Sequence, residues 1–189
     1  DALKPITQMV TLYLQLDRRS DAIKLLRGKL GEFPLLELTL AQVLGEGKDN
    51  AEKDEAEKLY RKVLEADPQN VVANNNLADL MVRRYSEDPA KLKEARALAE
   101  VAAASNDPIA LDTLGWIQHL QGENDAALIA LGKASHLEPN TPVIIYHYAA
   151  AMAGAGKKDE ARKMLKLLLD KFKNFPERKE AEALMKSIN

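Results

Sequence analysis

Prolines recur at a fixed interval along this chain of 189 residues. Pro108, Pro142 and Pro176 are separated by 34 residues each, and the same interval separates Pro34 from Pro68. A period of this length is typical of stacked helix–turn–helix units, in which each unit buries its apolar face against its neighbours. The periodicity therefore predicts an all-α solenoid of antiparallel helix pairs.

Other side chains follow the same period. Gly122 recurs as Gly156 and Leu131 recurs as Leu165, so the repeat extends to turn and core positions. The chain is predicted to be a single domain, 1–189, made of five helix pairs and a capping helix, with the bounds 3–36, 37–70, 71–107, 108–141, 142–175 and 176–188.

Capping residues and glycines set the expected ends of the helices. Asp107 precedes Pro108 and Thr141 precedes Pro142, which is the pattern of an N-cap followed by proline at the first helical position. In the second unit, glycines 45 and 47 interrupt the first helix, which is therefore expected to end near Leu44. No stretch alternates with period two, as a half-buried strand would.

Composition and charge exclude several classes of function. The chain is 46% hydrophobic and 30% charged, which is normal for a folded protein. It has no cysteine, and this excludes disulfides, thiol catalysis and cysteine-ligated zinc. Lys and Arg total 27 against 29 acidic residues, whereas a nucleic-acid surface needs a basic excess, so nucleic acid is not an expected partner. No apolar run reaches the length of a membrane span, so direct membrane insertion is not expected either.

The sequence predicts neither catalysis nor a cofactor. The three histidines, His119, His136 and His147, do not form an HExxH arrangement, and the chain has no Gly-rich phosphate loop or G-x-S-x-G elbow. We therefore expect packing, capping or surface roles for the histidines, with no metal site. The chain is predicted not to be an enzyme.

The residue pattern of the fourth unit resembles the tetratricopeptide repeat (TPR) family, through Leu111, Leu114, Gly115, Ala127, Leu131, Ala134 and Pro139. The resemblance covers essentially the whole chain, although no unit has Trp at the first core position. It implies a right-handed superhelix in which the first helix of each pair lines a concave groove. The function that it implies is a non-catalytic scaffold for protein–protein interaction.

The groove positions of the family can be transferred to this chain unit by unit. The residues expected to bind a protein or peptide partner are Asn75, Asp79, Arg83, Asp112, Trp116, His119 and Tyr146. The first unit would add Lys4, Thr7, Thr11 and Leu14.

Trp116, the single tryptophan, has two interpretations. It could be an aromatic anchor for the partner, or it could pack against the next unit at Tyr146 or Tyr148. Because Asp79 and Asp112 would repel a carboxylate, a clamp for a peptide C-terminus is not expected, and a partner segment with basic or mixed character fits better.

A closer resemblance rests on residues 111–116 (Leu-Asp-Thr-Leu-Gly-Trp) and 146–149 (Tyr-His-Tyr-Ala). These segments are similar to the last repeats of bacterial TPR proteins of the exosortase/PEP-CTERM system. The resemblance implies a role in exopolysaccharide production at the bacterial envelope, a periplasmic or envelope location, and a chain that is the C-terminal piece of a longer array. The alternative function is a structural spacer or self-association module, which would make the protein a homo-oligomer.

Overall fold

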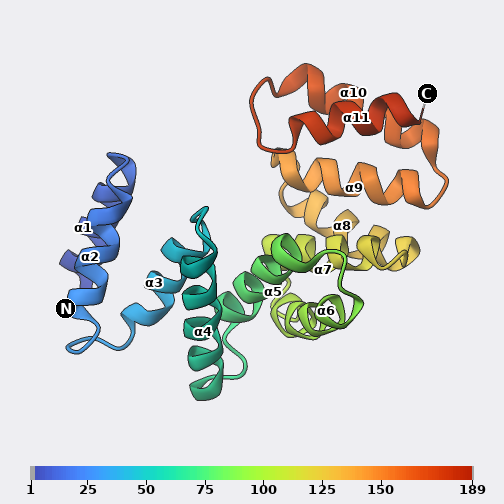
Figure 1. Ribbon diagram of the computed structural model, residues 1–189. Coiled ribbons are helices and arrows are strands. Elements are labelled where there is room, and N and C mark those ends of the chain that lie inside the picture. Colours follow the sequence, from blue (N-terminus) through green and yellow to red (C-terminus); the bar gives the residue numbers. More distant parts are fainter. Residues whose placement is uncertain (1–2, 189) are drawn as a thin grey trace. The chain divides into compact units, whose positions relative to one another are not determined.

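The chain is all-helical in its computed structural model, which describes residues 3–188 (Figure 1). Within this range there is no strand, which confirms the predicted all-α class. The helices are α1 (Leu3–Gln15), α2 (Arg19–Lys29), α3 (Leu36–Gly45), α4 (Asn50–Ala66), α5 (Val71–Tyr85), α6 (Pro89–Ala103), α7 (Pro108–Leu120), α8 (Asn124–Leu137), α9 (Pro142–Gly154), α10 (Lys158–Lys171) and α11 (Arg178–Ser187).

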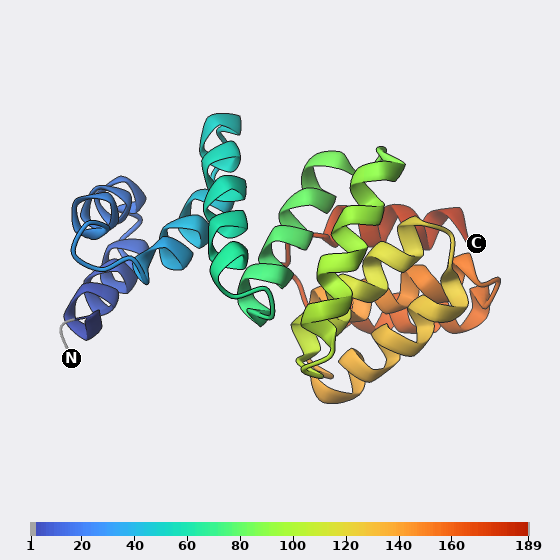
Figure 2. The ribbon, with the colours of Figure 1, turned by 90° about the horizontal axis from the view of Figure 1, so that it is seen from below.

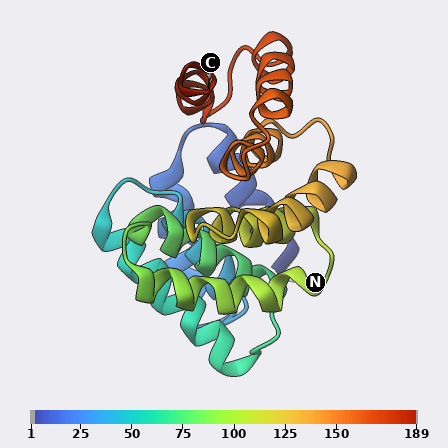
Figure 3. The same ribbon diagram turned by 90° about the vertical axis from the view of Figure 1, so that its right-hand side faces the viewer.

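The helices divide between two compact units, Asp1–Leu80 and Met81–Asn189, with the boundary inside α5. In the first unit, α1 lies against α2, α2 against α3, and α3 against α4 (Figure 2). In the second unit, α6 lies against α7 and α8 against α9, while α10 lies against both α9 and α11 (Figure 3). Each helix thus contacts near neighbours in the sequence. The expectation of a single domain stays a prediction.

Aspartates start several of the helices. The carboxylate of Asp107 accepts hydrogen bonds from the backbone N–H groups of residues 109 and 110, and Asp88 caps α6 in the same way. Asp49 caps α4 with a single bond, which it accepts from the N–H of residue 51. These bonds satisfy donors that have no partner inside the helix. Thr141 occupies the predicted N-cap position before Pro142, but its side chain makes no capping bond. The cap expected there is therefore absent, and the proline alone marks the start of α9.

The first helices of three of the pairs end in turns of the same type. Asp17, Gly122 and Gly156 follow α1, α7 and α9 with φ angles of 56°, 80° and 79°. After α7, the Gly122 N–H donates to the carbonyl of residue 119, and the next N–H donates to the carbonyl of residue 118. This pair of bonds is a Schellman motif, which requires a left-handed residue and so favours glycine. The helix α3 ends at Gly45, as the sequence predicted.

Small residues allow the two helices of the fourth pair to approach closely. A Cβ atom added to Gly115 of α7 would lie 2.5 Å from Leu131 Cγ of α8. Ala127 and Leu131 are fully buried, together with Ala151 of α9. Protein interiors are packed without spare volume, so this contact sets the distance between the helices.

Replacing Gly115 with alanine should destabilise the protein by about 1–3 kcal/mol, because the added methyl group must displace Leu131. The matched control is Gly28→Ala in α2, where an added Cβ meets no atom within 4 Å. There the higher helix propensity of alanine should stabilise the protein by about 0.5–1 kcal/mol. Urea unfolding of both variants measures the two effects, and equal stabilisation by both would contradict the packing argument.

Candidate functional site

Four aromatic rings gather where α7 and α9, the first helices of two adjacent pairs, lie against each other. Trp116 of α7 stacks on His147 of α9, with ring centroids 4.1 Å apart and planes at 17°. His119 and Tyr146 lie at 5.1 and 5.9 Å from the same indole ring. The structure therefore packs Trp116 against the next unit while its side chain stays partly exposed.

Asp112 and His147 form a polar contact beside these rings. Nδ1 of His147 is 3.0 Å from both carboxylate oxygens of Asp112, and a proton on this nitrogen is donated to the carboxylate. The exposed fractions of the two side chains are only 12% and 10%. Burial removes water from the imidazole and the carboxylate, and their contact replaces the hydrogen bonds that water would have made. The contact therefore ties α7 to α9.

His119 is held at the corner between α7 and α8. Its Nδ1 lies 2.6 Å from Oδ1 of Asn124, the first residue of α8. Gly154, the last residue of α9, approaches the same amide closely, since a Cβ added there would lie 2.4 Å from Asn124 Oδ1. The imidazole ring is thus oriented by a neighbouring side chain.

Tyr146 lies in a core formed with the end of the chain. It is buried together with Leu165 of α10 and Ala181 of α11. Burial raises the pKa of the Tyr146 phenol, and the nearby carboxylates of Glu180 and Glu177 raise it further. Glu177 Oε2 is itself buried without a hydrogen-bond partner among the described residues. This part of the second unit is therefore both aromatic and acidic.

The structure brings together four of the predicted groove residues, namely Asp112, Trp116, His119 and Tyr146. Asn75 and Asp79 belong to the first unit, so their position relative to these four is not described. Asn75 is buried, and Arg83 is exposed in the second unit. The prediction that these side chains bind a partner stays a prediction.

From the sequence, we expected only a packing, capping or surface role for His147. Its contact with Asp112 joins residues that are 35 apart, which is one more than the repeat period. A search for complementary side chains near this interval would have found the pair, because first helices of adjacent units lie against each other.

The first unit contains a cavity of about 390 Å³ between α1 and α3, the first helices of its two pairs. Thr7, Thr11 and Leu14, which were predicted to face the groove, all line it. The Thr7 and Thr11 hydroxyls donate to backbone carbonyls of α1 itself. Arg19, at the edge of the cavity, is held by Glu52 at 2.6 Å and by a backbone carbonyl of α3. The cavity therefore offers mainly methyl groups and apolar side chains.

In residues 3–188, no three histidine, aspartate or glutamate side chains are grouped so that they could hold a metal ion. Over the same residues, no helix combines the length and the apolar character that crossing a bilayer requires.

Comparison with known sequences supports the repeat family. Residues 118–187 match the model of a tetratricopeptide repeat. No curated protein sequence matches the chain.

Solved structures show the same fold at low sequence identity. A thermophilic TPR protein of Thermus thermophilus superposes with a TM-score of 0.72 at 21% identity, over 98% of this chain and 97% of that one. PilW, a widely conserved type IV pilus biogenesis factor, gives 0.81 at 20% identity, over 100% of this chain and 84% of its own. PilF of Pseudomonas aeruginosa gives 0.74 at 20% identity, over 98% and 87%. These similarities confirm the TPR solenoid fold.

Replacing His147 with alanine should destabilise the protein by about 1–3 kcal/mol, because the buried Asp112 carboxylate loses its partner. His136→Ala is the matched control, since His136 is exposed, and it should change the unfolding free energy by less than about 0.5 kcal/mol. Urea unfolding measures both. Equal effects would show that the Asp112–His147 contact contributes no stability.

The raised pKa of Tyr146 predicts a loss of stability at alkaline pH. An unfolded tyrosine ionises near pH 10, whereas the folded phenol keeps its proton to a higher pH. The contribution of Tyr146 is therefore complete below about pH 10 and is lost as the pH rises through the folded pKa. Tyr146→Phe should weaken this decline. Unfolding free energies measured across the alkaline range test it, and identical slopes in both proteins would contradict the assignment.

Proposed function

We propose that this protein is a non-catalytic scaffold that binds a segment of a partner protein along the first helices of its pairs. The cavity between α1 and α3 is the observation that carries the proposal. Three of its nine lining residues, Thr7, Thr11 and Leu14, are residues that the repeat positions predicted for the groove, and it is wide enough to receive apolar side chains of a bound segment.

The chemistry of the second unit indicates the character of the partner segment. Trp116 is partly exposed beside Tyr146, and Glu177 and Glu180 lie close enough to affect the ionisation of that phenol. Aromatic rings next to carboxylates favour basic and apolar side chains over acidic ones. We therefore propose a partner segment of mixed basic and apolar composition.

A clamp for a peptide C-terminus is disfavoured by two residues of the first unit. In the first unit, the positions that would carry its lysine and asparagine hold Thr7 and Thr11, whose hydroxyls are bound to their own helix. Neither side chain offers the positive charge that a carboxylate needs.

The proposed setting is the bacterial envelope. Two of the structural neighbours are described as a type IV pilus biogenesis factor and as PilF of Pseudomonas aeruginosa, and their similarity to this chain is one of fold. The proposal also rests on the resemblance of residues 111–116 and 146–149 to TPR proteins of the exosortase/PEP-CTERM system. On the strength of that resemblance, we propose a scaffold for exopolysaccharide assembly at the envelope.

Capture experiments test the groove. We expect Thr11→Arg to fill the α1–α3 cavity and to remove a bound partner from material captured out of a bacterial envelope extract. Gln8→Arg is the matched control, because this exposed residue lies on the same helix and does not line the cavity. Loss of the same proteins with both variants, or with neither, would contradict binding in the cavity.

The single tryptophan provides a second test with a purified partner segment. Fluorescence of Trp116 should shift when the segment occupies the second unit, because the exposed part of the indole ring loses water. Circular dichroism confirms that each variant is folded. Binding of the segment with an unchanged emission spectrum would place the contact away from α7 and α9.

A further inference from the structure

A cavity of about 600 Å³ lies along α8, the second helix of the fourth pair. Four of the residues that line it, Ile129, Lys133, His136 and Leu137, share one face of α8, because they follow one another at helical spacing. Ile129 and Leu137 are 66% and 51% exposed. Described helices precede and follow this pair, so the exposed apolar face does not belong to an end of the array. Such a face beside a cavity indicates a contact surface.

The neighbouring helices complete the lining of this cavity. Leu111 lines it from α7 and Tyr148 lines it from α9. Gly132 of α8 makes room for the tyrosine, since a Cβ atom added there would lie 3.4 Å from Tyr148 Oη. The hydroxyl makes no hydrogen bond with a described residue. The cavity therefore combines an apolar lining with an O–H group that can donate to a bound molecule.

The charged residues that line the cavity are both basic. Lys133 and His136 are exposed, and neither forms a hydrogen bond or an ion pair with a described residue. Two acidic residues, Asp107 and Glu138, adjoin lining residues in the sequence but do not line the cavity themselves. The carboxylate of Asp107 is already bound to backbone N–H groups of α7. The group that complements this cavity is therefore a carboxylate from outside it.

The second helix pair shows how a lysine at this repeat position finds a partner. Lys62 lies 25 residues after Glu37, the first residue of the second repeat, and Lys133 lies 25 residues after Pro108, the first residue of the fourth. Lys62 forms an ion pair with Glu37, and both residues line a cavity of about 420 Å³. In the fourth repeat, proline stands where the glutamate would be. Lys133 thus has the surroundings of Lys62 without the carboxylate.

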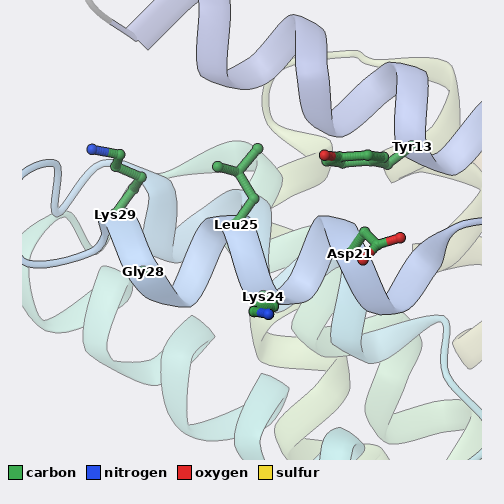
Figure 4. Close-up of a pocket in the computed structure, with 6 residues that line it drawn as sticks. All are labelled: Tyr13, Asp21, Lys24, Leu25, Gly28 and Lys29. Carbon is green, nitrogen blue, oxygen red and sulfur yellow. The ribbon is translucent and has the colours of Figure 1, made fainter.

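Another cavity also has charged residues that are paired within the chain. Between α1 and α2 lies a space of about 400 Å³ (Figure 4). Two of the three charged residues that line it are Asp21 and Lys29, which pair with Arg18 at 2.7 Å and with Glu32 at 2.8 Å. The cavity along α8 differs, because both of its basic side chains are left for a partner.

We propose that the cavity along α8 binds a segment of a partner protein that carries apolar and acidic side chains. The apolar side chains of the segment fill the space between Ile129 and Leu137. A carboxylate of the segment pairs with Lys133, as Glu37 does with Lys62 in the second pair. This surface is additional to the groove along the first helices, it prefers the opposite charge, and it does not depend on that groove.

Selection from a displayed library of random short peptides tests the chemistry of the partner with the whole chain. Peptides that bind the wild-type protein and fail to bind the double variant Lys133→Glu/His136→Glu should be rich in aspartate or glutamate together with leucine, isoleucine or phenylalanine. The double variant should instead select lysine and arginine, because the charge preference is reversed. The proposal is overturned if both proteins select the same peptides, if no peptide depends on the two residues, or if the dependent peptides are basic.

The affinity of one selected acidic peptide, carrying a fluorophore, locates the contact. In fluorescence anisotropy, Leu137→Ser and Lys133→Glu should each weaken binding by about tenfold, the first through lost apolar contact and the second through repulsion. The matched control is Lys166→Glu, an exposed residue of α10 that does not line the cavity, and it should leave the affinity unchanged. Thr11→Arg should also leave it unchanged, which separates this surface from the cavity between α1 and α3.

Circular dichroism checks that each variant is folded. Equal losses with Lys133→Glu and Lys166→Glu would show a general attraction between the protein and an acidic peptide, and would overturn the proposed site. A loss with Thr11→Arg alone would also overturn it, because the peptide would then occupy the cavity of the first unit.

Discussion

Close contact between the two helices of a pair is the constraint on which this structure depends. Where α7 meets α8, Gly115 has no side chain and Leu131 fills the space that one would occupy. The second helix can then lie near enough for its small residues to be buried, as Ala127 is. Each pair presents an apolar side to the next, and the solenoid continues because no pair can bury that side alone.

Contacts between pairs bring together the side chains of the proposed groove. The stacking of Trp116 on His147 and the bond from His147 to Asp112 hold α7 and α9 in a defined register. These same side chains carry the aromatic and acidic character assigned to the groove. The proposed binding surface therefore includes residues that stabilise the fold, and a variant at this place must be shown to fold before its binding is interpreted.

The repeat period predicted the helix pairs well because each period of 34 residues forms one helix pair, which packs on the next pair. The early end of α3 at Gly45 followed from glycine, and the start of α7 followed from aspartate before proline. The missing capping bond of Thr141 could not be predicted, because it depends on side-chain orientation. The contact of His147 with Asp112 left a signal only in the spacing of the two residues, which is close to the repeat period. The exposure of Leu12 depends on what lies beside α1, which its own sequence does not encode.

Contacts between near neighbours also make local stability uneven along the first unit. The pair α1 and α2 lies against α3 on one side, and its other face meets no described helix. Opening of this pair breaks few contacts, so its amide protons should exchange with solvent by a local route that needs less free energy than global unfolding. Asp17, held in a left-handed conformation that glycine adopts more easily, adds to this tendency. Within the described residues, the N-terminal pair should therefore open more easily than a pair that has neighbours on both faces.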